Sequence, residues 1–225
     1  MTKLQKPIIV VNFKVYREAE GVKALEMAKI CQFVSETSGV TIAVCPPAAE
    51  LGYVARNVRI PVFSQNADLY VPGPATGWMP PSLIKAAGAA GTLINHSEHK
   101  ITLNAIADII RSCKECGLPA VVCADSLETA VKTAKYCPDA IAVEPPELIG
   151  GNISVTDADP GVVENTVKAV KEIDSSISVL CGAGIKTGAD VKRALELGAD
   201  GVLLSSGVVK AKDPRAVLAG LVKYL

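Results

Sequence analysis

The segment Ile8-Ile9-Val10-Val11-Asn12-Phe13-Lys14 begins the pattern that decides the fold. Its first four residues form a continuous branched aliphatic run, which is typical of a strand buried on both faces of a parallel sheet. The run then ends in an amide and an amine. Because strand side chains alternate, we expect Asn12 and Lys14 on one side and Phe13 on the other.

Seven further runs of this kind follow along the chain, and amphipathic stretches with helical spacing separate most of them. Ser126 and Asp213-Pro214 are typical helix starts, and Asp190 lies near another. The expected strands lie at 8–13, 41–45, 60–64, 92–95, 120–123, 140–143, 178–181 and 201–204. The expected helices lie at 18–37, 102–116, 127–136, 159–173, 189–197 and 214–224.

This alternation predicts β-α units and a parallel sheet. Eight strands in 225 residues indicate a single closed (β/α)8 barrel, with one domain over residues 1–225. A doubly wound open sheet is the alternative, because periodicity alone does not separate the two folds.

Composition excludes some classes of function. Lys and Arg number 23 and Asp and Glu also number 23, so no net charge attracts nucleic acid or an anionic membrane. No apolar run reaches the ~18 residues of a membrane span, and the first residues lack a signal-peptide pattern. We therefore expect a cytoplasmic protein. Cys113 and Cys116 have the spacing of a metal or redox pair, but the sequence offers no partner cluster, which favours a shared helix face.

Polar residues at the strand ends are the candidates for chemistry, because the loops that follow barrel strands build the active face. Asn12 and Lys14 suit an anionic, oxygen-rich ligand, although a strand end in solvent has the same composition. His96 follows the fourth strand, and the helical stretch after it would disfavour the protonated ring. A neutral imidazole there is able to donate a hydrogen bond to a carbonyl; a structural histidine is the alternative.

The sixth strand ends at Glu144, and the loop after it reads Pro145-Pro146-Glu147-Leu148-Ile149-Gly150-Gly151. Partial desolvation at a barrel mouth would raise the pKa of Glu144 and make the carboxylate a better base. The apolar tip of the loop suits a segment that closes over a ligand and excludes water. An ordinary Pro/Gly loop with an exposed glutamate is the alternative.

The last two strands end in small residues, Cys181-Gly182-Ala183-Gly184 and Ser205-Ser206-Gly207. Small residues let backbone N–H groups approach a phosphate closely, and the ends of strands seven and eight are a common phosphate site in barrels. Other phosphate-binding barrels share this feature.

Taken together, these segments resemble the triosephosphate isomerase family along nearly the whole chain, which implies the TIM-barrel fold. The segments that carry the resemblance are Asn12-Phe13-Lys14, Ser64-Gln65-Asn66, Thr76-Gly77, His96-Ser97-Glu98, Glu144-Pro145 with its loop to Gly151, Cys181 to Gly184, and Ser205-Ser206-Gly207.

The resemblance implies an intramolecular aldose–ketose isomerase that interconverts dihydroxyacetone phosphate and D-glyceraldehyde 3-phosphate in glycolysis and gluconeogenesis. Glu144 would be the base, His96 the electrophile and Lys14 the cation beside the substrate, with Asn12 bonding the reacting oxygens and Glu98 supporting Lys14. Neither a metal nor an organic cofactor is implied. The implied phosphate-binding residues are Ile149, Gly150, Gly151, Ala183, Gly184, Ser205 and Ser206.

The chain departs from the common family pattern in its short length and trimmed later helices, which resemble the compact archaeal type. The loop after Glu144 and the Ala183-Gly184 turn also differ. The loop from Gln65 to Gly77 resembles the family loop that reaches a neighbouring subunit. We therefore expect a homo-oligomer, and the archaeal resemblance suggests a tetramer.

Two other functions remain open from the sequence. One is another phosphate-binding barrel enzyme, such as an aldolase or a synthase, with Lys14 as a Schiff-base lysine. The other is a catalytically silent sugar-phosphate binder, which would need no paired base and electrophile.

Overall fold

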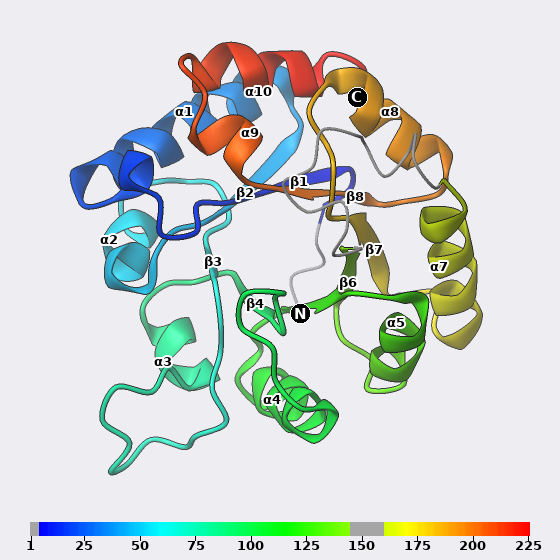
Figure 1. The fold of residues 1–225 in the computed structure, drawn as a ribbon. Helices are drawn as coiled ribbons and strands as arrows, with labels where there is room; N and C mark the ends of the chain where they lie inside the picture. Colours follow the sequence, from blue (N-terminus) through cyan, green and yellow to red (C-terminus); the bar gives the residue numbers. More distant parts are fainter. Residues whose placement is uncertain (1–4, 145–159) are drawn as a thin grey trace.

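A computed structural model describes residues 5–144 and 160–225, which form a barrel of eight parallel strands surrounded by helices (Figure 1). Neighbouring strands follow the order β2-β1-β8-β7-β6-β5-β4-β3. The strands are β1 (Ile8–Asn12), β2 (Thr41–Cys45), β3 (Phe63–Ser64), β4 (Gly91–Ile94), β5 (Ala120–Ala124), β6 (Ala140–Val143), β7 (Ser178–Cys181) and β8 (Gly201–Leu204).

The gap between β3 and β2 is closed by a parallel bridge between Val44 and Val62, where the Val44 N–H donates to the Pro61 carbonyl at 3.0 Å. This contact makes the sheet a nearly closed barrel and excludes the open doubly wound sheet. The strand expected at 60–64 is wrong in length, because β3 begins only at Phe63. Proline has no N–H to donate, so Pro61 interrupts the ladder at this point.

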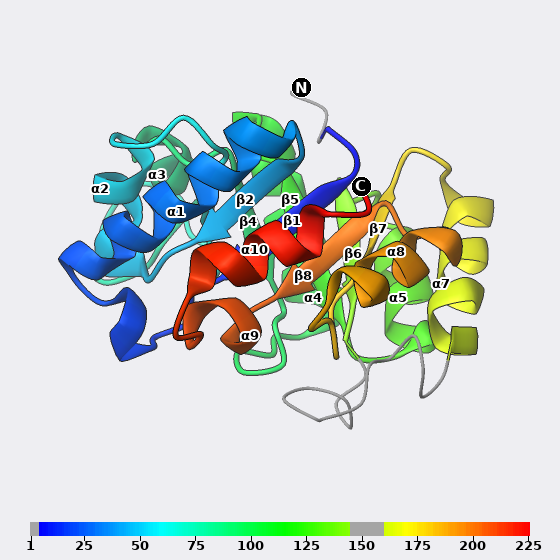
Figure 2. The same cartoon turned by 90° about the horizontal axis from the view of Figure 1, so that it is seen from above.

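Helices form the outer layer around the strands (Figure 1). Figure 2 shows α1, α10 and α8 on the outer side of the β1, β8 and β7 part of the barrel. No helix in the two described ranges is long and apolar enough to cross a membrane. The α-helices are α1 (Val22–Ser38), α2 (Leu51–Ala55), α3 (Pro81–Ala86), α4 (Leu103–Cys116), α5 (Leu127–Ala134), α7 (Pro160–Ile173), α8 (Gly188–Glu196), α9 (Ser206–Val209) and α10 (Pro214–Val222), with 3-10 turns η1 (Arg17–Ala19) and η2 (Ala48–Glu50).

Side-chain caps account for several helix starts. Ser126 accepts from the Thr129 N–H at the start of α5, and Asp213 accepts from Ala216 at the start of α10. The expectation of one helix over 18–37 is wrong, since Gly21 has a φ of 61° and separates η1 from α1. A residue in that conformation does not continue a right-handed helix.

Strand alternation divides the core into two clusters. The odd-numbered β1 residues and Phe13 pack outward against the helices, as predicted, whereas Ile8 and Val10 point into the barrel. Asn12 has the same parity as Ile8 and Val10, which places its polar side chain at the inner edge where the strands end. The inner cluster consists of Ile8, Val10, Ala43, Cys45, Phe63, Leu93, Val121, Cys123, Ala140, Ala142, Leu180 and Leu203.

All seven cysteines lie within the described ranges and are free thiols. Cys113 is buried on α4, and the Cys116 thiol donates to the Cys113 carbonyl at 3.4 Å, so the pair shares a helix face.

Candidate active site

A cavity of about 520 Å³ lies where the barrel strands end. An adjoining pocket of about 420 Å³ shares Asn12, Lys14 and His96 with this cavity and adds Glu98. The structure therefore brings together candidates from five strand ends, those of β1, β4, β6, β7 and β8. The candidates lining the main cavity are Asn12, Lys14, His96, Glu144, Ala183, Gly184, Ser205 and Ser206.

Lys14 is held in an uncommon backbone conformation at the mouth of the barrel, with a φ of 48°. The Asn12 side-chain oxygen accepts from the Lys14 N–H at 2.9 Å. Gln65 Nε2 donates to both the Lys14 carbonyl and the Cys45 carbonyl at 2.9 Å. The Lys14 amine forms an ion pair with Glu98 at 2.8 Å. These contacts fix both the backbone and the charge of Lys14 beside the cavity.

His96 is buried and follows β4. The Glu98 backbone N–H donates to His96 Nδ1 at 3.2 Å, so a neutral ring carries its proton on Nε2. Burial lowers the pKa of His96 and the Lys14 charge lowers it further, whereas Glu98 opposes them. The ring is therefore suited to donate a hydrogen bond while neutral.

The cause predicted for a neutral His96 needs correction. The helix after β4 begins only at Leu103, capped by the Thr102 side chain, rather than directly after the histidine. A tight turn follows His96 instead, in which the His99 N–H donates to the His96 carbonyl at 2.7 Å. The turn presents the Glu98 N–H to the ring, so a local donor and burial take the place of a helix end.

Glu144 is the buried carboxylate of the site, and its side chain faces His96. Its Oε1 lies 3.8 Å from His96 Nε2. The pKa of Glu144 is raised to about 7, mainly by burial. The negative charge of Glu98 also raises this pKa, whereas a hydrogen bond from the Cys123 thiol and the charge of Lys14 act in the opposite direction. A carboxylate with a pKa near neutrality is an effective general base.

Two buried side-chain oxygens in the described ranges lack a hydrogen-bond partner, Glu144 Oε2 and Ser205 Oγ. Buried polar groups are usually bonded, so such orphans call for an explanation. Both residues line the same cavity. The two orphans lie at opposite functional ends of the predicted site, one at the base and one at the phosphate turn.

The turns after β7 and β8 supply the small residues predicted for phosphate. Gly184 has a φ of 70°, and α9 begins at Ser206, directly after β8 and Ser205. Residues of these two turns line the same cavity as Glu144. The other phosphate candidates, Ile149, Gly150 and Gly151, lie outside the described residues.

Three residues acquire site roles that sequence reasoning did not assign. Cys123 is part of an apolar strand run, and only its place on the strand beside Glu144's strand links it to the base. Gln65 carried the family resemblance without a stated role, and the structure joins it to Lys14. Gly182 leaves room for the Glu144 side chain, since a Cβ built there would overlap the Glu144 Cγ.

A buried carboxylate, an imidazole with a lowered pKa and an ion-paired ammonium group, gathered at the strand ends of a parallel barrel, are groups typical of an acid–base enzyme of the (β/α)8 class. The family model described as triosephosphate isomerase matches residues 7–224. The chain belongs to the triosephosphate isomerase family, a family of aldose–ketose isomerases.

Relatives of nearly equal length come from archaea. Triosephosphate isomerase of Methanocaldococcus jannaschii is 50% identical over 218 residues, covering 97% of this chain and 100% of that protein. The Methanothermus fervidus enzyme of the same name is 48% identical over 219 residues, covering 97% and 99%. These matches confirm the resemblance to the compact archaeal type.

A solved structure with lower identity supports the fold. The crystal structure of triosephosphate isomerase from Bartonella henselae aligns with a TM-score of 0.75 and 19% identity. The alignment covers 95% of this chain and 98% of that one, so the barrel is shared along the chain.

Proposed function

We propose that this enzyme interconverts dihydroxyacetone phosphate and D-glyceraldehyde 3-phosphate in glycolysis and gluconeogenesis, by proton transfer through an enediolate. The observation that carries the proposal is the buried pair of Glu144 and His96, 3.8 Å apart, with one Glu144 oxygen unpartnered within the described residues. A buried, unsatisfied carboxylate destabilises the fold, and catalysis gives a reason for its presence.

In this proposal Glu144 removes the proton from the carbon beside the substrate carbonyl and returns it to the neighbouring carbon. The neutral His96 ring donates from Nε2 to the carbonyl oxygen, which stabilises the developing negative charge. Lys14 supplies the fixed positive charge next to that oxygen, and Asn12 hydrogen-bonds the reacting oxygens. Glu98 positions Lys14 through the 2.8 Å ion pair.

The phosphate would lie at the opposite end of the cavity, against the turns after β7 and β8. Backbone N–H groups at Ala183, Gly184, Ser205 and Ser206 are the proposed donors, and the orphaned Ser205 hydroxyl lies beside them. Ile149, Gly150 and Gly151 are proposed to complete this site on sequence grounds alone.

The two rival functions fit the site less well. A Schiff-base enzyme needs an unprotonated lysine amine, whereas the Lys14 amine forms an ion pair with Glu98. A Schiff-base function would also give the Glu144–His96 pair no role. A silent binder would gain nothing from a buried carboxylate with one oxygen that has no hydrogen-bond partner among the described residues. Trapping of substrate on Lys14 by borohydride would favour the first rival, and binding without turnover the second.

The test is isomerisation of glyceraldehyde 3-phosphate, coupled to NADH oxidation through a dihydroxyacetone-phosphate reductase. Wild type is assayed beside Glu144→Gln, which has nearly the same shape and no base. We expect wild-type kcat/KM of about 10⁷–10⁸ M⁻¹s⁻¹, within the range of very efficient enzymes, and a loss of orders of magnitude in the variant. Absence of turnover in wild type would reject the proposal.

We also propose a homo-oligomer, in the form of a tetramer, with the loop from Gln65 to Gly77 at a subunit interface. This loop extends away from the barrel between β3 and α3 (Figure 1). Val71 on the loop is 78% exposed, and exposed Tyr70 stacks on Trp78 at 4.5 Å. Exposed apolar side chains of this kind are typical of interaction surfaces.

Sedimentation of wild type beside Val71→Asp tests the assembly. A buried charge at an interface weakens association, so the variant should dissociate at lower protein concentration. Val22→Asp on α1, where Val22 is 68% exposed, is the matched control and should sediment as wild type does. A monomeric wild type at working concentration would contradict the proposal.

Two further expectations stay proposals: one domain over residues 1–225 and a cytoplasmic location. Seven free thiols suit a reducing compartment. Fractionation of the source cells with enzyme activity as the marker tests the location.

A further inference from the structure

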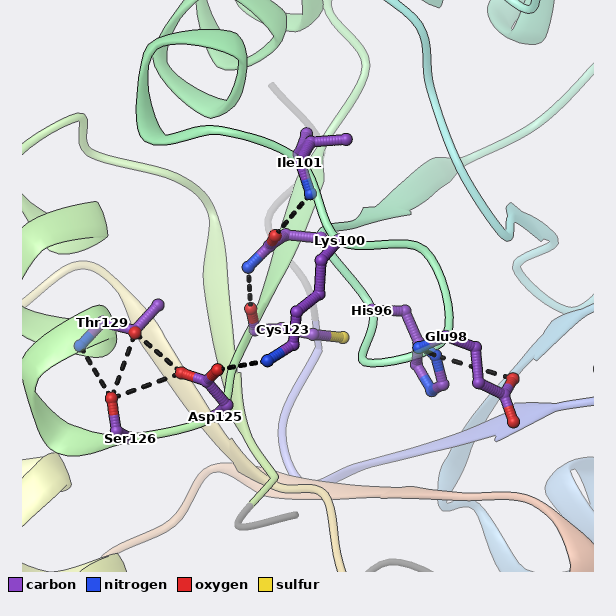
Figure 3. Close-up of polar contacts among 9 residues, drawn as sticks. His96, Glu98, Lys100, Ile101, Cys123, Asp125, Ser126 and Thr129 are labelled. Atoms are coloured by element: carbon purple, nitrogen blue, oxygen red, sulfur yellow. Dashed lines mark hydrogen bonds and ion pairs between the residues drawn. The ribbon is translucent and has the colours of Figure 1, made fainter.

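Asn95 joins the loop that carries His96 to the strand that supports Glu144. Its side-chain Nδ2 donates to the Cys123 carbonyl at 2.9 Å, and its Oδ1 accepts from the Ile101 N–H at 3.1 Å. Figure 3 draws both contacts as dashed lines that end at Cys123 and Ile101. One amide thus connects the end of β4, the end of β5 and the approach to α4.

The position of these bonds relates the two halves of the acid–base pair. Asn95 directly precedes His96 in the chain, so its backbone sets the start of the turn that presents the ring. Cys123, at the other end of the bond, directly precedes Ala124, whose carbonyl accepts from the Glu144 N–H at 2.8 Å, and the Cys123 thiol lowers the pKa of the Glu144 carboxyl. The electrophile and the base are therefore each one step away from the same amide.

The backbone of Asn95 adds a second requirement. Its φ is 60°, in the left-handed region that asparagine and glycine tolerate better than other residues. Glycine would satisfy the backbone alone. The turn conformation therefore does not require the half-buried Asn95 side chain or its two hydrogen bonds, because a turn of this conformation forms without any side chain.

A second connection lies between the same two loops but farther from the chemistry. Lys100 forms an ion pair with Asp125 at 2.6 Å, and Asp125 also accepts from Thr129 next to the start of α5. Lys100 points toward Asp125, whereas Glu98 points to the opposite side of the His96 turn (Figure 3). The Lys100 side chain is 54% exposed, and an exposed ion pair constrains a loop weakly.

We propose that Asn95 is a positioning residue that fixes the separation of His96 Nε2 and the Glu144 carboxylate, by bonding the His96 loop to the end of β5, where the Glu144 N–H is also bonded. The proposal rests on the acid–base function proposed above. It assigns to Asn95 a role in kcat rather than in substrate affinity, because neither of its bonds points into the phosphate end of the cavity. Loss of the amide would leave each group present but the pair misaligned.

Asn95→Gly is the informative variant, because glycine keeps the left-handed backbone and removes both side-chain bonds. We expect kcat to fall about tenfold to a hundredfold, the loss associated with a displacement of about 1 Å, and KM to change less than threefold. Lys100→Ala removes the other connection between the same loops and serves as the matched control. It should lower the melting temperature with kcat within twofold of wild type.

A carboxyl NMR titration of Glu144 in unliganded wild type and Asn95→Gly provides a readout that does not depend on turnover. The Cys123 thiol lowers the pKa of Glu144 in wild type. Loss of the Asn95 bond should weaken this effect of Cys123, so the titration midpoint of Glu144 should move to higher pH. Asn95→Gly with wild-type kcat and an unchanged midpoint would overturn the proposal. Wild type without isomerase activity but with a shifted midpoint in the variant would reject the proposed function and retain the positioning role.

Discussion

Gly182 and Glu144 are in such close contact that no side chain fits between them. A Cβ built on Gly182 would overlap the Glu144 Cγ, and would lie 3.2 Å from its Cδ and 3.1 Å from the Val143 carbonyl. The Gly182 N–H donates to that same carbonyl at 2.9 Å, which fixes the backbone of one residue against the other. Gly182 is therefore required for space rather than for an unusual backbone conformation.

We predict that Gly182→Ala will displace the Glu144 carboxyl and reduce kcat by about a hundredfold, with a stability loss of about 1–3 kcal/mol from overpacking. Steady-state kinetics and urea unfolding measure the two effects. Gly220→Ala on α10 is the matched control, since a Cβ there meets no atom within 4 Å. That control should keep full activity and gain up to about 1 kcal/mol in helix stability. A fully active Gly182→Ala would contradict the prediction.

The second prediction concerns the cost of burying Glu144. Its pKa in the folded protein is about 7, above the ordinary value of 4.5. Between these pH values the folded chain binds a proton that the unfolded chain has lost, so stability falls as pH rises through this window. Glu144→Gln avoids ionisation. The variant should therefore be more stable than wild type by up to about 3 kcal/mol above pH 7, and by little near pH 4.5.

Urea unfolding of both proteins at pH 5 and pH 8, at one fixed protein concentration, measures this difference. Glu128→Gln is the control, because the Glu128 side chain is 76% exposed on α5 and should show no such gain. An equal stability difference at the two pH values would contradict a raised pKa at Glu144.

Sequence reasoning succeeded where a periodic pattern and a strand end determine the position of a side chain. The parity of β1 predicted that Asn12 and Lys14 lie opposite Phe13, and the apolar run before Glu144 predicted its desolvation. Seven of the eight expected strands lie within one residue of their observed bounds at each end. The exception, β3, contains Pro61 in its expected range, and that proline removes a ladder donor.

The site contacts that sequence reasoning did not predict join residues that are far apart in the sequence, and sequence spacing does not reveal such contacts. Cys123 lowers the pKa of Glu144 from the neighbouring strand β5, and Gln65 reaches Lys14 from a distant loop. The left-handed φ values of Lys14 and Asn95 are invisible in sequence, because neither residue is glycine. The short helices α2, α3 and α9 were not predicted either, since fewer than two turns give no clear period.

Lys14→Ala should damage both substrate binding and turnover. The variant loses the only proposed cation next to the carbonyl oxygen and leaves Glu98 without its 2.8 Å partner. We expect kcat to fall by about a hundredfold or more and KM to rise, because a charge-stabilising group acts in both the bound and the transition state. Lys100→Ala removes a lysine from the same face as the control. Near-normal kinetics for Lys14→Ala would remove Lys14 from the mechanism.

The last prediction uses the charges around Glu144 to set the pH dependence of kcat/KM. Glu144 must be ionised to act as a base, so kcat/KM of wild type should fall as pH drops through about 7. The negative charge of Glu98 raises the pKa of Glu144, and Lys14 lowers it. In Glu98→Gln the like charge is gone and Lys14 is released from its ion pair. Both changes favour the Glu144 carboxylate.

The acid limb of the Glu98→Gln profile should therefore move to lower pH, even if the maximal rate declines. The second ionisation of the substrate phosphate, near pH 6, also affects the profile, but it is common to both enzymes and does not alter the difference between them. Glu128→Gln, at an exposed glutamate on α5, should leave the limb in place. A limb that moves to higher pH would mean that Glu98 acts on Glu144 mainly by holding Lys14 in place, rather than as a neighbouring negative charge.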